Sequence, residues 1–99
     1  MIVEIGIIEA KAGQGDQLEA GLKKAREVIS QADGYRGSTF HRCIENPDRC
    51  VIYIKWASVD AHMKGFREGP LFPQWRSHFA DLMGGPPNVQ HYDVFASDD

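Results

Sequence analysis

The chain has 99 residues, of which 42% are hydrophobic and 25% charged, with a formal net charge of −3. This composition predicts one folded domain over residues 1–99 with a polar tail at 96–99. The scattered basic residues argue against a nucleic-acid-binding face. No apolar run reaches the roughly 20 residues that cross a bilayer, and the N-terminus lacks signal-peptide features. We therefore expect a cytoplasmic protein without nucleic-acid or membrane partners.

The first two expected elements are a strand and a helix. The segment from Ile2 to Ala10 is rich in β-branched residues, which suits a strand covered on both faces. From Asp16 the apolar residues recur at steps of three and four, which predicts a helix. Asp16 and Glu19 fit a capping box, and Gly34 fits a left-handed stop. The exposed positions of this helix are charged, so we expect it to be scaffold.

Two strands follow, from Tyr35 to Ile44 and from Cys50 to Trp56, joined by the turn residues 46–48. A hairpin symmetric about this turn would place two sets of side chains on one face, and a one-residue change of register would reverse the faces. The sets are Gly37, Thr39 and His41 from the first strand and Ile52, Ile54 and Trp56 from the second. The same register places Cys43 opposite Cys50, where a disulfide is conceivable, although a reducing compartment favours free thiols.

The last part of the chain predicts a broken helix and a strand. Ser58 is a natural N-cap for a short helix that ends near Gly69, and Pro70 suits the start of another. The expected inner positions are Val59, Met63 and Phe66 in the first helix and Leu71, Trp75, Phe79 and Leu82 in the second. The segment from Asn88 to Ala96 is the last expected strand.

The element order β, α, β, β, broken α, β predicts an α+β fold. Short connections and right-handed crossovers favour a ferredoxin-like βαββαβ unit, with a four-stranded antiparallel sheet and helices on one face. Because the strands are apolar on both parities, the second face of the sheet also needs a cover. A homodimer through the sheet is the simplest cover, since twofold closure is the commonest symmetry.

Local motifs do not indicate a metal or cofactor site. The chain contains no nucleophile elbow of the Gly-x-Ser-x-Gly type, and its Gly13-Gln14-Gly15 run lacks the third glycine of a dinucleotide loop. Its four histidines form no closely spaced ligand pair, so a metal site would have to be assembled in three dimensions.

Aromatic and cationic residues gather between Trp56 and Trp75. Such residues form either the wall of a small-molecule pocket or plain core packing. His62, on or beside an inner helix face, suits proton transfer, and Arg67 either caps the helix or binds an anionic group. The other members of the candidate binding set are Phe66, Phe72, His41, His91 and Tyr92. For His91 and Tyr92, cross-strand packing is an equally good explanation.

Three stretches resemble the antibiotic biosynthesis monooxygenase family. They are Trp56-Ala-Ser58-Val-Asp60-Ala-His62, Gly65-Phe66-Arg67-Glu-Gly69-Pro70-Leu-Phe72 and Trp75-Arg76. The run Pro87-Asn-Val89-Gln-His91-Tyr92 fits one branch of this family. The resemblance implies a dimeric α/β barrel with a pocket between sheet and helices. Characterised members of the family include oxygenases that need no cofactor, so the resemblance also implies this activity. If the resemblance holds, Trp56 stacks on the substrate, His62 acts as the base and Arg67 contacts an anionic group.

The sequence departs from the haem-degrading members of the family. Those relatives use an Asn on the first strand and a His one helical turn beyond the position of His62. Here the first strand has no Asn and Phe66 occupies the axial position, so haem degradation is disfavoured. Three interpretations remain. The first is a cofactor-independent monooxygenase acting on a small phenol or quinol. The second is a non-catalytic dimer that binds a small aromatic or reactive metabolite, and the third is a structural or stress-associated dimer with a vestigial pocket.

Overall fold

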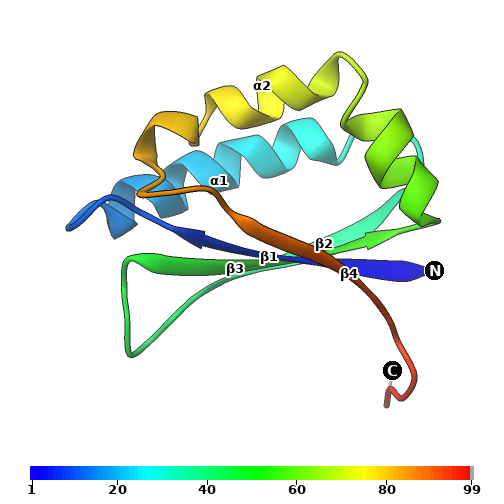
Figure 1. Ribbon diagram of the computed structural model, residues 1–99, viewed down its shortest axis with the longest axis horizontal. Coiled ribbons are helices and arrows are strands. Elements are labelled where there is room, and N and C mark those ends of the chain that lie inside the picture. The colour runs from blue at the N-terminus through cyan, green and yellow to red at the C-terminus, as the bar shows by residue number, and fades with distance from the viewer. Residues whose placement is uncertain (99) are drawn as a thin grey trace.

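Four antiparallel strands form one sheet, and the helices pack on one of its faces (Figure 1). The computed structural model describes residues 1–98, so Asp99 of the expected polar tail lies outside the described residues. The strands are β1 (Ile2–Glu9), β2 (Tyr35–Arg42), β3 (Arg49–Trp56) and β4 (Asn88–Asp93), in the order β2-β3-β1-β4. The predicted ferredoxin-like fold is confirmed.

The helical segment between β3 and β4 is broken where the sequence predicts. It comprises the π-helix η1 (Ala61–Phe66), the α-helix α2 (Leu71–Ser77) and the short 3₁₀-helix η2 (Ala80–Leu82). Pro70, which has a fixed φ and no N–H, directly precedes α2. Within residues 1–98, no helix is both long and apolar enough to cross a bilayer.

The helix α1 (Gly15–Ile29) is held at its start by another part of the chain and not by a capping box. Asp16 and Glu19 instead pair with the guanidinium of Arg42, at 2.7 and 3.5 Å. Asp48 of the β2–β3 turn accepts a hydrogen bond of 3.1 Å from the backbone N–H of Gly15. The predicted capping box is therefore wrong, because both carboxylates face a cation on the neighbouring strand.

The register of the β2–β3 hairpin differs by one residue from the predicted one. Phe40 lies opposite Ile52, so Phe40 shares the helix-covered face and His41 points to the other face. The cause is the turn: the N–H of Cys43 donates to the carbonyl oxygen of Arg49 at 2.9 Å, which leaves an odd number of residues in the loop. Cys50 now opposes Arg42, and both cysteines are free thiols.

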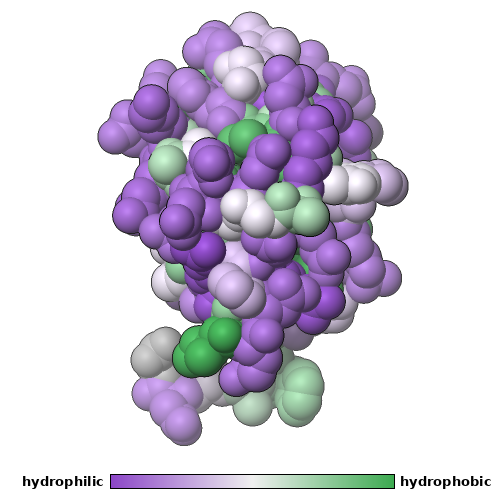
Figure 2. Space-filling view, turned by 90° about the vertical axis from the view of Figure 1, so that its left-hand side faces the viewer, coloured by the Kyte–Doolittle hydropathy of each residue, from purple (hydrophilic) through white to green (hydrophobic). Residues whose placement is uncertain are grey.

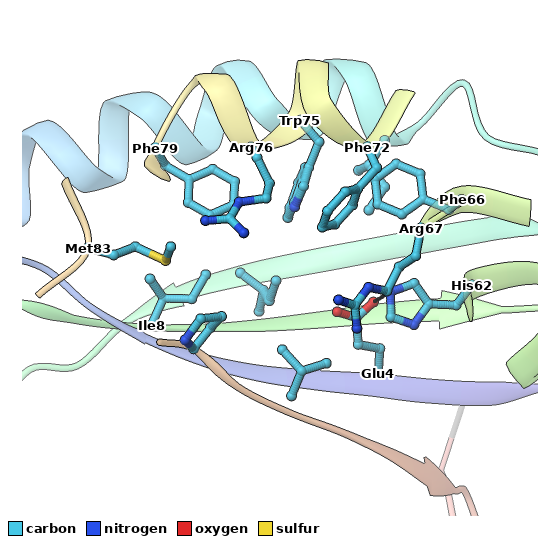
Figure 3. Close-up of a pocket in the computed structure, with 14 residues that line it drawn as sticks. Glu4, Ile8, His62, Phe66, Arg67, Phe72, Trp75, Arg76, Phe79 and Met83 are labelled. Atoms are coloured by element: carbon cyan, nitrogen blue, oxygen red, sulfur yellow. Dashed lines mark ion pairs between the residues drawn. The ribbon is translucent and has the colours of Figure 1, made fainter. Parts of the chain in front are cut away.

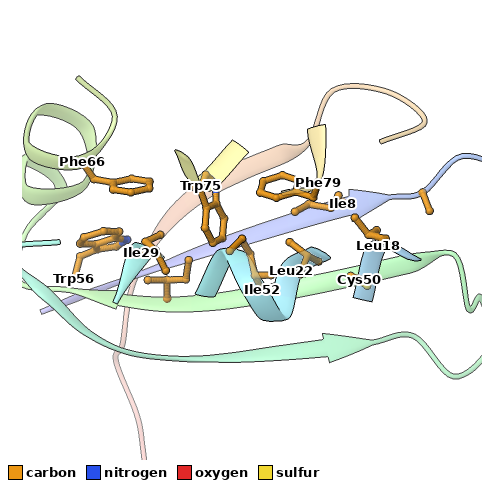
Figure 4. Packing of buried hydrophobic residues seen from close by; sticks show 13 residues of the cluster. Ile8, Leu18, Leu22, Ile29, Cys50, Ile52, Trp56, Phe66, Trp75 and Phe79 are labelled. Carbon is orange, nitrogen blue, oxygen red and sulfur yellow. The ribbon is translucent and has the colours of Figure 1, made fainter. Parts of the chain in front are cut away.

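The hydrophobic core fills the space between the helices and the covered face of the sheet (Figure 4). Every second residue of β3 contributes a buried side chain, from Cys50 to Trp56, and Trp56 is completely buried. The inner side of α1 and the aromatic side chains of η1 and α2 pack on the sheet residues and form the helical side of the core. The core does not fill this layer completely, and the cavity described next lies between the sheet and the segment from η1 to η2.

Candidate functional site

A cavity of about 320 Å³ lies between the sheet and the segment from η1 to η2 (Figure 3). Its size is at the small end of the roughly 300–1,000 Å³ of small-molecule sites. Most of its wall is apolar or aromatic, and its polar groups are few. The lining residues that matter below are Glu4, His62, Phe66, Arg67, Phe72, Trp75 and Arg76.

The π-helix η1 turns His62 toward the cavity. The N–H of Arg67 donates to the carbonyl oxygen of His62 at 2.9 Å, a bond that spans five residues and widens the turn. His62 and Phe66 therefore form the buried side of η1, whereas Val59 is 41% exposed. The predicted inner stripe with Val59 and Met63 is wrong, because it assumed the 3.6-residue period of an α-helix.

Glu4 is a carboxyl group buried on the helix-covered face of β1, with only 4% of its surface exposed. The indole Nε1–H of Trp56 donates to its Oε1 at 2.9 Å, and Nε2 of His62 lies 3.2 Å from the same oxygen. The other oxygen, Oε2, has no hydrogen bond within residues 1–98. Since none of the described buried side-chain oxygens lacks a partner, Oε2 must be accessible, and the space it borders is the cavity.

His62 is fixed on three sides. Its Nδ1 lies 2.8 Å from Nε2 of His91, which sits opposite Glu4 on β4. Its ring stacks on that of Trp56 with centroids 5.1 Å apart and an interplanar angle of 18°. Strands β1, β3 and β4 and the π-helix thus each place one side chain in a single polar cluster, Glu4–Trp56–His62–His91.

Burial shifts both titratable groups at the centre of this cluster. Burial raises the pKa of Glu4 to about 7, against the hydrogen bond from Trp56 and the charge of Arg67, which lower the pKa. Burial also lowers the pKa of His62 to about 4, helped by the charges of His91 and Arg67. His62 is therefore neutral near pH 7, so its contact with Glu4 is not an ion pair there.

The neutral state of His62 fixes where its proton lies. A proton on Nε2 meets an oxygen of Glu4, whereas a lone pair there would oppose the oxygen's own lone pairs. Nδ1 is then the acceptor, and His91 donates to it from Nε2. Both ring nitrogens of His62 face protein groups, which leaves Oε2 of Glu4 as the group of this cluster that can take a proton from a ligand.

Two arginines line the same cavity. Arg67 lies just after η1, and its guanidinium carbon is 5.3 Å from the ring centroid of Phe72, in a cation–π contact. Arg76 lies in the last turn of α2. Figure 3 shows the Arg67 side chain extending toward Glu4 and His62, and Arg76 farther along the cavity.

The structure brings together most of the residues that the sequence singled out. Five of them line the cavity: His62, Phe66, Arg67, Phe72 and Trp75. His91 contacts His62 from β4. Trp56 is fully buried behind His62 and so does not fit a role in stacking on a ligand.

Two predicted binding residues lie elsewhere. His41 is on the uncovered face of the sheet, where its Nδ1 lies 3.1 Å from the carbonyl oxygen of Val51. Tyr92 is also on that face, and its hydroxyl donates to Gln90 at 2.9 Å. Neither lines the cavity.

Sequence reasoning missed Glu4. In the folded chain Glu4 shares its parity along β1 with Ile8 and Ala10, which belong to the core. The other parity of β1 is apolar as well, so alternation alone did not place Glu4 inside. Arg76 was noted only as part of a motif, without a role. Within residues 1–98 no group of three or more His, Cys, Asp or Glu side chains could hold a metal ion.

Comparison with known proteins gives a consistent assignment. Residues 1–78 match the family model described as antibiotic biosynthesis monooxygenase. A solved structure from Bordetella bronchiseptica, provisionally described as an antibiotic biosynthesis monooxygenase, is 35% identical with a TM-score of 0.90, over 96% of this chain and 97% of that one. SnoaB, a cofactor-independent oxygenase from Streptomyces nogalater, is 12% identical with a TM-score of 0.82, over 98% of this chain and 95% of that one, which shows the fold alone.

A curated relative carries a different activity. A mycobilin-producing haem oxygenase from Mycobacterium tuberculosis is 23% identical over 93 residues, covering 94% of this chain and 88% of that protein. Proteins similar to this chain therefore carry out more than one kind of oxygen chemistry, and the residues of the site have to distinguish between them. From the match over residues 1–78 and the 35% identical structure, the chain belongs to the antibiotic biosynthesis monooxygenase family.

Proposed function

We propose that this protein is a cofactor-independent monooxygenase that acts on a small phenol- or quinol-like molecule. The observation that carries the proposal is Glu4, a carboxyl group in an aromatic-lined cavity with one oxygen held and the other accessible. With a pKa of about 7, Glu4 is suited to accept a proton near neutral pH.

The proposed reaction balances without an external reductant. Glu4 takes the hydroxyl proton of the substrate, and the resulting phenolate is electron-rich enough to pass electrons to dioxygen. A carbon–oxygen bond forms at the ring carbon para to the hydroxyl, and the resulting hydroperoxide then loses water. One phenol and one dioxygen give one para-quinone and one water, so the substrate supplies all four electrons.

The protein groups have distinct roles in this scheme. Arg67 stabilises the phenolate, since its charge already acts on Glu4 and His62. Trp56 and His62 hold Oε1 and so aim Oε2 at the substrate, and His91 fixes the tautomer of His62. This scheme replaces the expectation that His62 itself is the base, because both its ring nitrogens face protein groups.

Haem degradation fits these residues poorly. Phe66 provides no ligand at the position where the resemblance implies an axial histidine. His62, the one histidine that lines the cavity, faces Glu4 and His91 through its two nitrogens. A cavity of about 320 Å³ suits a one- or two-ring molecule better than a macrocycle of four pyrroles.

Oxygen uptake tests the proposal. We expect the protein to raise uptake above the spontaneous rate for at least one member of a panel of phenols and para-quinols. A phenol with hydrogen at its para carbon should gain one atom of ¹⁸O₂, whereas a para-quinol, already hydroxylated there, would give the quinone and hydrogen peroxide. His62→Ala should lower this rate by roughly 10–100-fold, because misplacement of a reacting group by about 1 Å has effects of that size. His78→Ala, which removes a histidine outside the cavity, is the matched control.

The panel also separates the alternatives. Absence of uptake on every phenol and quinol would refute the monooxygenase proposal. Ligand-induced quenching of tryptophan fluorescence without uptake would then favour a non-catalytic binding protein, and inertness in both assays would favour a vestigial pocket. The expected cytoplasmic location stays a prediction.

The uncovered face of the sheet supports a homodimer. Ile7, Tyr53 and Tyr92 lie there with 38%, 43% and 45% of their surfaces exposed. Figure 2 views the molecule from one end, and this side is largely polar with scattered hydrophobic side chains. An apolar sheet face without a cover favours pairing with a second copy.

Sedimentation tests the dimer. We expect wild-type protein to sediment as two copies of 11.1 kDa, and Ile7→Glu to sediment as one, because the variant places a charge on the apolar face. Ile44→Glu, at a position 91% exposed beyond the end of β2, makes the same change outside this face and should stay dimeric. A wild-type species of 11.1 kDa at all concentrations would refute the dimer.

A further inference from the structure

The arginines that line the cavity differ from all others in the chain. The chain has six arginines. The four that do not line the cavity each bond to a protein group: Arg26, Arg36, Arg42 and Arg49. Within residues 1–98, the guanidinium groups of Arg67 and Arg76 have neither a hydrogen bond nor an ion pair. The two unpaired guanidinium groups therefore both belong to one cavity.

Charge balance within the cavity leaves Arg76 unpaired even when Glu4 is ionised. Glu4 is the one acidic residue among those that line the cavity, and it lies beside His62 and Arg67. Arg67 also has the Phe72 ring beneath it. A positive charge at Arg76 interacts favourably with the dipole at the C-terminal end of α2. That interaction needs only a nearby charge, so it does not explain why the side chain lines the cavity.

The spacing of the polar groups describes a ligand. Figure 3 shows Arg76 separated from the Glu4–His62–Arg67 group, with Trp75 and Phe72 between them along the wall. A ligand that fills this cavity thus has an apolar, ring-shaped middle, an acidic hydroxyl at the Glu4 end and an anionic group at the Arg76 end. A planar guanidinium matches a carboxylate through two parallel hydrogen bonds.

We infer that the substrate is a hydroxylated aromatic carboxylate of one or two rings, whose carboxylate is recognised by Arg76. This inference rests on the proposed function for the identity of the hydroxyl end, but the role of Arg76 concerns binding alone. Arg76 then determines specificity and Arg67 serves the reacting oxygen.

Calorimetric binding of a matched ligand pair tests the inference. The pair is 6-hydroxy-2-naphthoate, with its hydroxyl and carboxylate at opposite ends, and its uncharged methyl ester. We expect wild-type protein to bind the acid about tenfold more tightly than the ester, as a charge-assisted hydrogen bond implies. Arg76→Gln should leave the affinity for the ester unchanged and lower the affinity for the acid until the two lie within about twofold of each other.

Two further variants make the test specific. Arg67→Gln should weaken both ligands alike and keep the preference for the acid, and Arg36→Gln, outside the cavity, should change neither affinity. The inference is overturned if wild-type protein binds acid and ester equally, if it binds neither, or if Arg76→Gln keeps the preference. Oxygen uptake is measured separately, on the phenol and quinol panel, so a preference for the acid together with no turnover of any panel member refutes only the proposed function.

Discussion

Replacing Glu4 by glutamine should reduce oxygen uptake by a factor of roughly 10²–10⁴, the range that general-base catalysis contributes. Glutamine keeps an acceptor for the indole N–H of Trp56 and nearly the same volume, so the cavity should keep its shape. What it lacks is a group that can take the proton of the substrate. Binding of a phenol should therefore survive while turnover is lost.

The same substitution should make the protein more stable in alkaline solution. The pKa of Glu4 is raised from 4.5 to about 7 in the folded protein, so the folded state binds more protons than the unfolded state between these pH values. The contribution of Glu4 to stability thus falls as pH rises from 4.5 to 7 and stays low above. Near pH 8, Glu4→Gln should raise the free energy of unfolding by about 3 kcal/mol, and near pH 5 by little.

Urea unfolding at pH 5 and pH 8, together with uptake at pH 8, checks both parts. Glu27→Gln makes the same change on an exposed position of α1 and should leave stability and uptake near wild-type values at both pH values. If Glu4→Gln turned over substrate at the wild-type rate, Glu4 would not be the base. A stability gain equal at pH 5 and pH 8 would show that the carboxyl group is not held with a raised pKa.

Replacing Trp56 by phenylalanine should move the pH dependence of the reaction upward. The hydrogen bond from Trp56 is the main interaction that lowers the pKa of Glu4, so its loss lets burial raise that pKa further above 7. Uptake requires ionised Glu4, and its half-maximal pH should rise accordingly. A hydrogen bond to a charged group contributes roughly 1.5–3 kcal/mol, so the variant should also lose about that much stability at pH 8.

The pH profile separates this effect from general damage to the core. Trp75→Phe removes the other indole, which lines the cavity but has no hydrogen bond to Glu4, and should change the rate without moving the midpoint. The stability deficit of Trp56→Phe should shrink at pH 5, where Glu4 is protonated in both proteins. An unchanged midpoint in Trp56→Phe would refute the role of the indole in setting the pKa of Glu4.

The fold was largely predictable because its signals are local. The β-branched run of β1, the turn around Asn46 and the break at Pro70 each act within a few residues, and together they determine the element order. The hairpin register was not predictable in the same way, because one extra residue in the loop reverses the two faces. His41 was assigned to the wrong face for this reason.

The site was predictable only in part because its contacts are distant in sequence. The residues of η1 and α2 lie close together in the chain, so Phe66, Arg67 and Trp75 were identified together. Glu4 is far from them, and β1 is apolar on both parities, so alternation did not show which face the helices cover. The π-helix itself was not predictable, because no sequence pattern indicates a hydrogen bond that spans five residues. Val59 was therefore placed wrongly on the inner side, whereas His62 was expected on or beside it.

The dispersal of the polar cluster along the chain also has a consequence for biosynthesis. Trp56 leaves the ribosome 52 residues after Glu4, and His91 follows a further 35 residues on (91 − 56). A nascent chain therefore cannot complete the cluster until β4 has been translated and has joined β1. If the proposed function holds, a partly synthesised chain cannot activate oxygen, because the site is complete only once β4 is in place.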